Sequence, residues 1–408
     1  MPIAAIPHYL GTDFTHAPPG MRFGMYLKLW DAGWSKSKDG PLDSARRLNP
    51  NDQKTMKALL ARQQQAFNTS AGADASLRLD ALATAPFTTG LGNEHPLENG
   101  FAFLNPYGLP YLPGSGVKGV LRQAARELAS GEWGDTRGWS EDKRYTLMEG
   151  EGKDRRLRLD NNNRNKQPVM LSMLDVLFGR EAPEGDSGHV RGALTFWDVI
   201  PQIKGDHLAV EIMTPHQGHY YQQKQDPKTG HSTTPHDSGQ PVPISFLTVP
   251  PGSGFAFHVV CDTAHLRRLA PEMAEAGNDG APVWKTLLTA AFEHAFAWLG
   301  FGAKTAVGYG SMEKKDPGQA PREGQSGGAA TQKGVQEAIV WHGAHLKFNR
   351  ANKSLTAEKD GGFAIAIAPK GEELLARLPV EIRSKVESNQ HVKVTARVSG
   401  RDLLEIET

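Results

Sequence analysis

The chain of 408 residues has a single cysteine, Cys261. One thiol cannot form a disulfide within the chain, and it cannot build a cysteine-based zinc site. Cys261 ends a run, Phe255 to Cys261, whose β-branched and aromatic content is typical of a strand. We therefore predict a buried structural thiol and expect no cofactor.

Excess charge of one sign is also missing. The 46 Lys and Arg residues are balanced by 45 Asp and Glu residues, which leaves a net charge of +1. This balance excludes the global basic field with which some proteins attract nucleic acids. Any contact with a polyanion must then come from a local group of cations.

Long apolar runs are absent from the sequence. Nowhere do about 18 apolar residues follow one another, and Met1 to Leu10 lacks the features of a secretory leader. The apolar content of 38% is enough for the cores of two or three ordinary domains. We expect a cytoplasmic protein with no membrane contact.

A change in composition divides the chain. Residues 316–334 are rich in Pro, Gly, Gln, Ser and Ala and predict a flexible linker between a large domain, 1–315, and a small accessory domain, 335–408. The accessory domain is expected to be β-rich. Its predicted strands are Ala338 to Phe348, Gly362 to Ala368 and His391 to Val398, around a helical Gly371 to Glu387.

The large domain mixes the periodicities of helices and strands. Helices are predicted at Asp52 to Phe67, at Ser115 to Ala129 with Ser115 as N-cap, and at Trp284 to Leu299 with Gly300 as the stop. Strands are predicted at Gly20 to Trp30, Ser76 to Thr89, Gly192 to Ile200, His207 to Met213, Val242 to Val249, Phe255 to Cys261 and Thr305 to Glu313. The order fits an α+β fold with a ferredoxin-like (RRM-like) βαββαβ core and large insertions.

A first segment with chemical content is Asn105 to Arg126. Its turn residues are expected to present backbone N–H groups at the start of a helix, where an anion is favoured. Lys118, Arg122 and Arg126 then recur every four residues, and such like-charge pairs repel by roughly 0.2–0.5 kcal/mol each unless they are screened. The alternative is a solvated helix face with Glu127 nearby.

Both this segment and a second one are rich in glycine. Lys118 is followed by Gly119, which departs from the order of a nucleotide-binding P-loop. The second segment, Gly300 to Gly310, combines four glycines with Lys304 and Thr305. Two Gly/Lys loops on separate elements indicate an anion-binding role more strongly than either loop alone.

PYLPGSGVKGVLR and GFGAKTAVGYG together resemble the two hallmark motifs of RAMP proteins of CRISPR systems. FGR at Phe178, GALTFWDVIP from Gly192, IMTPHQGHYY from Ile212 and VPISFLTVPPG from Val242 are similar to the family of sixth subunits of type III-B Cmr complexes. The resemblance spans about residues 20 to 313. It implies a non-catalytic subunit that grips the guide RNA backbone near its 3′ end and caps a filament of RAMP subunits.

The resemblance also implies which residues contact RNA. They are Gly114, Ser115, Lys118, Gly119 and Arg122 of the first motif, Gly302, Lys304, Thr305, Gly308, Tyr309 and Gly310 of the second, and His216 and His219 between them. The four-residue spacing of the cations adds Arg126 to this set. Gly116 stands where many relatives have a second serine, which removes one hydroxyl contact. The partners implied are CRISPR guide RNA, other Cmr RAMP subunits and, as an open alternative, target RNA.

The histidine-rich stretch leaves other functions open. His207, His216, His219, His231 and His236 include an H-x-x-H spacing that suits a metal, although their polar surroundings favour a loop. His216 or His219 is also the candidate base of the rival function, a metal-independent endoribonuclease that processes CRISPR RNA.

Three further features each have a functional and a purely structural interpretation. Lys153 to Lys166 is either an RNA-contacting arm or a solvated loop. Tyr220 and Tyr221 are either stacking platforms for bases or packing residues. The remaining carboxylates lack the clustering of a metal-dependent nuclease and favour capping and turn roles; they are Asp175, Asp198 and Asp262.

Overall fold

The computed structural model describes residues 8–11, 13–27, 29–30, 41–150, 153, 155–159, 167–182, 188–214, 243–315, 339–349, 354–359, 362–366, 374–387, 392–399 and 402–407. The chain divides into two compact units, Met1–Gly327 and Gly328–Thr408. The predicted linker, 316–334, lies outside the described residues, and the predicted domain boundaries stay a prediction.

An antiparallel sheet of four strands forms the centre of the first unit. Its order is β10 (Leu194–Phe196), β13 (Gly254–Cys261), β1 (Ser76–Ala83) and β14 (Met312–Lys314). The register places Leu79 opposite Phe257 and Leu82 opposite Glu313. Helix α4 (Gly114–Ser130) follows β1 along the chain, and α9 (Val283–His294) follows β13.

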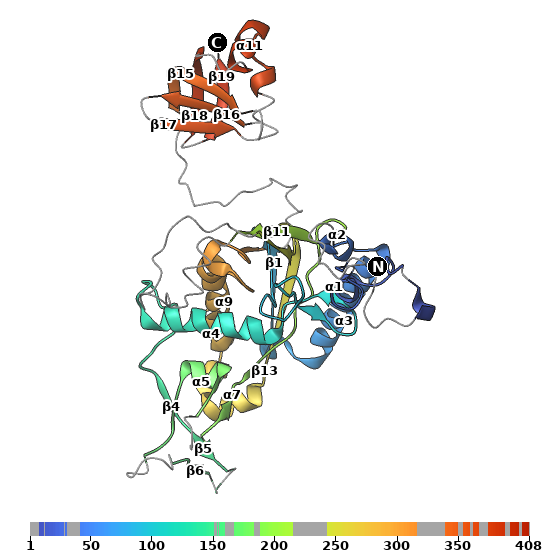
Figure 1. Cartoon of the computed structure of the whole chain (residues 1–408). Helices are drawn as coiled ribbons and strands as arrows, with labels where there is room; N and C mark the ends of the chain where they lie inside the picture. The colour runs from blue at the N-terminus through green and yellow to red at the C-terminus, as the bar shows by residue number, and fades with distance from the viewer. Residues whose placement is uncertain are drawn as a thin grey trace, which may run out of the picture. The chain divides into compact units, whose positions relative to one another are not determined.

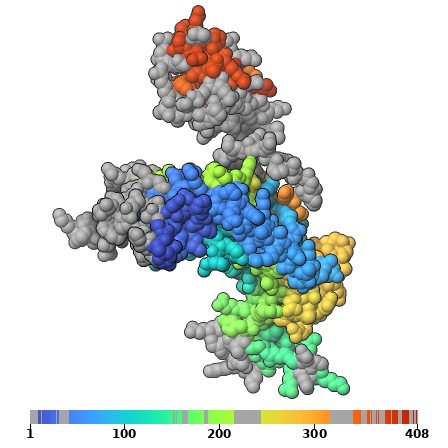
Figure 2. All heavy atoms as spheres, turned by 90° about the vertical axis from the view of Figure 1, so that its right-hand side faces the viewer, coloured from blue at the N-terminus to red at the C-terminus, as the bar shows by residue number. Residues whose placement is uncertain are grey.

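Helices cover both faces of this sheet. Residues of α4 and α9 share one hydrophobic core with the inner residues of β1 and β13, and the ring centroids of Phe257 and Phe292 are 5.3 Å apart. The opposite face meets α3 (Pro50–Ser70), where Phe67 packs edge-on against His258 at 4.8 Å. In Figure 1 the labels of β1 and β13 lie between those of α9 and α3. Figure 2 looks onto the α3 side of the unit.

The other elements of the first unit are short. Its helices are η1 (His8–Leu10), α1 (Pro19–Gly24), α2 (Pro41–Ala45), η2 (Ala73–Ala75), α5 (Met173–Phe178), α7 (Thr263–Leu269), α8 (Pro271–Ala274), a π-helical turn η4 (Ala295–Leu299) and η5 (Thr305–Val307). Its remaining strands are β2 (Phe103–Leu104), β3 (Leu109–Pro110), β4 (Arg144–Thr146), β5 (Met148–Glu149), β6 (Arg156–Leu157), β7 (Met170–Ser172), β8 (Gly179–Arg180), β9 (Val190–Arg191), β11 (Ala209–Met213) and β12 (Ile244–Thr248).

The three long predicted helices are confirmed as α3, α4 and α9 with its continuation η4. Gly300 ends the last of them with a positive φ of 70°. The predicted strand at Gly20 to Trp30 is wrong, because Pro19 begins the short helix α1 at its N1 position. The apparent two-residue alternation fails there: Arg22 and Phe23 are both buried, and the Arg22 guanidinium donates to backbone carbonyls of Ala17, Ser44 and Arg47.

The predicted strand at Thr305 to Glu313 is wrong over most of its length. Thr305–Val307 form the 3₁₀ turn η5, flanked by Lys304 and Gly308 with positive φ values of 60° and 92°. Such φ values are incompatible with an extended strand. Pairing with β1 begins only at Met312.

The second unit is a closed five-stranded barrel. Its strands are β15 (Ile339–Asn349), β16 (Ser354–Lys359), β17 (Gly362–Ala366), β18 (Val392–Ser399) and β19 (Asp402–Glu407), and their order around the barrel is β15, β16, β17, β19, β18. Helix α11 (Val380–Glu387) precedes β18. The sequence predicted β15, β17 and β18 but missed β16 and β19, whose mixed polar content hides the alternation. A separate core of leucine, alanine and valine residues belongs to this unit.

Cys261 is buried, as predicted, with 3% of its surface exposed. Burial, followed by the charge of Asp262, raises the pKa of its thiol to about 12. A thiol that remains protonated is a poor nucleophile, in keeping with a structural role. Among the described residues, no helix is both long and apolar enough to cross a membrane.

Candidate nucleic-acid interface

The start of α4 differs from the prediction in its cap. Pro113, and not Ser115, is the N-cap residue, and no side chain caps the helix from that position. Instead, the backbone N–H of Gly114 donates to Oδ1 of Asp198 at 2.7 Å. The positive end of the helix is therefore already matched by a carboxylate of the same chain. A phosphate is disfavoured there, and the exposed side of the helix becomes the better candidate.

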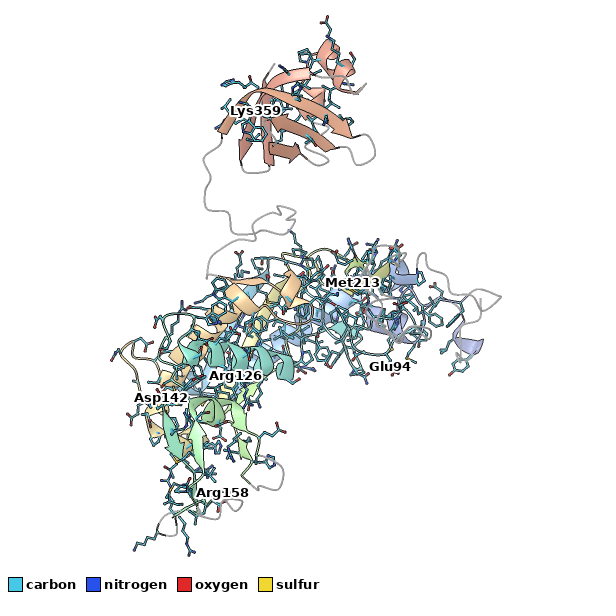
Figure 3. All side chains as sticks on the ribbon, turned by 60° about the vertical axis from the view of Figure 1, so that its left-hand side comes forward. Glu94, Arg126, Asp142, Arg158, Met213 and Lys359 are labelled. Carbon is cyan, nitrogen blue, oxygen red and sulfur yellow. The ribbon has the colours of Figure 1, made fainter. Side chains whose placement is uncertain are left out.

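That exposed side carries the predicted row of cations. Ser115, Gly119 and Arg126 are exposed, and Lys118 and Arg122 are half-buried. We call these five residues the α4 stripe; Figure 3 labels Arg126 on it.

The charges next to the α4 stripe only partly screen it. Arg122 lies 3.9 Å from Oδ1 of Asp175, and Arg126 donates to Gln123 at 3.1 Å. Glu127, next to Arg126 in the sequence, is half-buried, and its Oε2 lies 2.7 Å from Nε2 of the buried His294 and makes no ion pair with the stripe's cations among the described residues.

The glycines of the first motif have different reasons for being glycine. A Cβ on Gly114 would lie 2.2 Å from the carbonyl oxygen of Phe196, so this position needs glycine for packing. A Cβ on Gly119 would meet nothing within 4 Å. Glycine inside a helix costs about 1 kcal/mol relative to alanine. The fold does not need that cost at Gly119, which points to a ligand that approaches the helix backbone closely.

The second motif is tied to the chain that follows β1. Ala303 donates its N–H to the carbonyl of Thr88, and Gly310 donates to Pro86, both at 2.8 Å. Gly308 donates to Thr305 at 2.9 Å. These amides cannot hold a phosphate without losing their present acceptors. Fewer backbone N–H groups of this loop are therefore free to bind RNA phosphates than the sequence predicted. The side chains of the loop are the better candidates for that contact.

Lys304 is the principal charged side chain of this loop. Its Nζ lies 2.7 Å from Sδ of Met213 and 5.4 Å from the ring centroid of Phe246. The ring of Tyr309 packs on the same Phe246 at 5.8 Å, and burial, followed by the charge of Glu211, raises the pKa of its hydroxyl. The loop is thus seated on the sheet formed by β11 and β12. Thr305 is half-buried, while Gly302 and Gly308 are exposed.

The far end of the α4 stripe lies apart from the contacts of the Lys304 loop. Arg126, the last cation of the α4 stripe, lies well apart from Met213, the contact of Lys304, in the view of Figure 3. An extended polymer reaches both surfaces more readily than a small ligand does. His216 and His219 lie outside the described residues, as do Tyr220 and Tyr221, and their assignment stays a prediction.

Among the described residues, no group of three His, Cys, Asp or Glu side chains is placed to hold a metal. The three isolated carboxylates cap helices or pair with cations, as their sequence context indicated. Asp175 completes a capping box with Ser172, Asp198 accepts from Gly114, and Asp262 is the N-cap of α7.

The described part of the basic segment, 153 and 155–159, contacts its own unit. Arg158 pairs with Glu149 at 2.6 Å, and Arg155 donates to the carbonyl of Arg268 at 2.9 Å. In this part of the segment, Arg155 and Arg158 are thus engaged within their own unit, and the RNA-contacting arm stays a prediction.

Sequence reasoning missed the residues that support the motifs. Asp198, Met213 and Phe246 lie 84, 91 and 58 positions away from the motif residues they contact, and no local pattern links them. For Asp198 the sequence favoured a capping or turn role, but it did not indicate that α4 is the helix that the carboxylate meets. Its place two residues after the short strand β10 gives no such signal.

The comparisons identify the family. The RAMP superfamily model matches residues 81–313, which is more than half of the chain and includes both Gly/Lys motifs. The chain therefore belongs to the RAMP superfamily.

Within that superfamily the chain is similar to the CRISPR system Cmr subunit Cmr6 of Pyrococcus furiosus. The two are 30% identical over 249 residues, which cover 55% of this chain and 63% of that relative. The chain thus spans less than two thirds of the relative's length.

Two solved structures are also similar. One is the crystal structure of Cmr6 from Pyrococcus furiosus, with 26% identity, a TM-score of 0.28 and coverage of 59% of this chain and 98% of the other. The second is a cryo-EM structure of the type III-B Cmr-β complex bound to cognate target RNA, with 15% identity, a TM-score of 0.40 and coverage of 67% and 69%.

Proposed function

We propose that this protein is a non-catalytic RNA-binding subunit of a type III-B CRISPR Cmr effector complex. It holds the backbone of the guide RNA near its 3′ end and caps the filament of RAMP subunits in the cytoplasm. Its partners are the guide RNA and the other Cmr RAMP subunits, with target RNA as a further candidate partner. Similarity to a Cmr6 subunit and the two Gly/Lys motifs in the family's order support this function.

The order of the elements in the first unit supports a ferredoxin-like core for this subunit. Its elements follow one another as β1, α4, β10, β13, α9 and β14, and the sheet order is β10, β13, β1, β14. A βαββαβ chain with its first and third strands in the centre is the arrangement of that fold. The α4 stripe and the Lys304 loop then come from the two connections that follow β1 and β13.

The α4 stripe is the structural feature that supports RNA binding most directly. Three cations follow one helix face, and within the described residues Asp175 is the one acidic side chain that forms an ion pair with them. Such a row contacts phosphates without reading bases, which suits guides of varying sequence. The near-neutral charge of the whole chain predicts that the isolated protein binds weakly and that the complex gains affinity through many linked contacts.

We predict that the double variant K118Q/K304Q weakens binding of labelled single-stranded RNA to the full chain, whatever the RNA sequence. Each lost phosphate contact lowers the slope of log K against log salt by about 0.7, so two contacts change the slope by about 1.4 and the affinity roughly 10–30-fold at 0.1 M salt. Fluorescence anisotropy in EDTA across a salt series measures both quantities.

A matched control removes the same charge from the opposite side of the unit. Lys54 and Lys57 are exposed on α3, and K54Q/K57Q should leave affinity and slope near those of the unmodified chain. Equal behaviour of the two double variants would contradict the assignment of the motifs. The same samples run on a denaturing gel must show intact RNA, since defined cleavage would support the endoribonuclease instead.

A second prediction concerns Gly119. Replacing it by alanine should stabilise the protein by about 0.5–1 kcal/mol, because alanine favours the helix and the new methyl group has free space. The same change should weaken RNA binding several-fold if RNA approaches the helix backbone there. Thermal unfolding and anisotropy measure the two effects, and higher stability with unchanged binding would exclude Gly119 from the interface.

A further inference from the structure

The second unit presents a sheet face whose charges are all of one sign. Strands β15 and β18 contain three Lys or Arg residues and no Asp or Glu, whereas β19 contains three acidic residues and no Lys or Arg. The unit therefore separates its charges between strands. This face belongs to residues beyond 313, outside the part of the chain matched by the RAMP model.

The register shows that these cations share the outer side of the barrel. Ala344, Leu346, Val394 and Ala396 are buried, so the alternate residues of the two strands point outward. Lys347, Lys393 and Arg397 are exposed, and so is His342, whose Nδ1 lies 3.4 Å from Oγ1 of Thr395.

His345 stands directly opposite Lys393, and Val340 stands opposite Arg397. We call the face formed by Lys347, Lys393 and Arg397, together with the two histidines, the β15–β18 face. It ends at β19, where Glu405 stands opposite Arg397.

The barrel itself belongs to a class that binds oligonucleotides. A closed five-stranded barrel with its third and fifth strands parallel and a helix before the fourth is the arrangement of the OB-fold. A fold alone does not establish which ligand a protein binds, so the ligand and its site must be inferred from the residues on the barrel surface. Here Lys393 and Arg397 lie four positions apart on β18, about 13 Å along the strand, and Lys347 lies on the neighbouring β15. The three cations therefore form a row that an extended polyanion follows.

We propose that the β15–β18 face is a second RNA-binding site, which contacts the phosphate backbone of single-stranded RNA. This site binds RNA in addition to the contacts proposed for the first unit. Two weak sites on one chain raise each other's effective concentration for the same strand, so the pair binds more tightly than either site alone. Charge complementarity selects this ligand class, because the two strands carry cations and no acidic residues. Contacts to phosphates do not depend on the base sequence.

The test uses the full chain and a labelled, unstructured single-stranded RNA. The triple variant K347Q/K393Q/R397Q should lower affinity roughly 10–100-fold at 0.1 M salt and reduce the slope of log K against log salt by about 2. The matched triple R377Q/R383Q/K385Q removes the same charge from other exposed positions of the same unit and should have a much smaller effect. Circular dichroism melting checks that both variants remain folded.

The outcomes separate this proposal from the function proposed above. If the β15–β18 variant binds RNA like its matched control, the second site does not exist, whatever K118Q/K304Q does. If it loses affinity while K118Q/K304Q does not, the barrel binds RNA and the first-unit assignment fails. We expect each variant to lose affinity. A chain that carries all five substitutions should bind RNA more weakly than either variant.

Discussion

Replacing Gly310 by alanine is expected to destabilise the first unit by about 3–5 kcal/mol, the range of severe single substitutions with an identified steric cause. A Cβ at this position would lie 1.8 Å from the carbonyl oxygen of Phe301, and φ is +71°. The clash is with backbone, so the Phe301 N–H bond to the Gly310 carbonyl, now 2.9 Å, must break or shift. Phe301 is fully buried among Phe257, Phe292 and Phe296, and its displacement disturbs that core.

Gly308 provides the matched control for this prediction. It has a φ of +92° but nothing within 4 Å of a new Cβ, so G308A carries only the cost of a left-handed conformation, about 1–2 kcal/mol. Denaturant unfolding followed by tryptophan fluorescence measures both, because only Trp341 of the eight tryptophans lies in the second unit. Equal losses in the two variants would show that the loop relaxes around a Cβ at Gly310.

A second large effect is expected from acid. His258 lies 1% exposed in β13, packed against Phe67 and Trp197, and burial, followed by the charge of Arg78, lowers its pKa to about 4. Neither ring nitrogen has a hydrogen-bond partner within the described residues. The neutral ring is therefore the form that the fold accepts.

The sign of the pH dependence follows from this lowered pKa. The unfolded chain takes up a proton near pH 6.5, whereas the folded chain resists until about pH 4. The free energy of unfolding should be constant above pH 6.5 with respect to this group, and it should fall by about 3 kcal/mol as pH falls from 6.5 to 4. Nearby Asp80, whose charge opposes the shift, reduces the effect and does not reverse it.

Unfolding of the His258→Phe variant between pH 4 and 8 tests this assignment. The variant keeps an aromatic ring between Phe67 and Trp197 but cannot take up a proton, so its acid-induced loss should be smaller by most of that amount. His207→Gln changes an exposed histidine that binds Asp206 at 2.7 Å, and it should retain the full loss. An identical pH profile for His258→Phe and the unmodified chain would assign the acid sensitivity to other groups.

Much of the fold was predictable because long helices carry their own evidence. The apolar stripes of α4 and α9, and the stop at Gly300, follow from spacing and from the preference of glycine for positive φ. Short elements were not predictable in this way. Gly20 to Trp30 alternates like a strand, yet Pro19 and the buried guanidinium of Arg22 make its first part a helix, because tertiary hydrogen bonds outweigh a brief alternation.

The sequence by itself determined the composition limits, the three long helices and the two Gly/Lys motifs, since each rests on residues within a few positions of one another. Only the tertiary structure decided which distant residues contact those motifs and which of their glycines are needed for packing. It brought Asp198 to the start of α4, placed Lys304 on Met213 and Phe246, and separated the packing glycines, such as Gly114 and Gly310, from the open Gly119. Contacts between residues tens of positions apart depend on how sheet and helices pack, and local spacing carries no record of them.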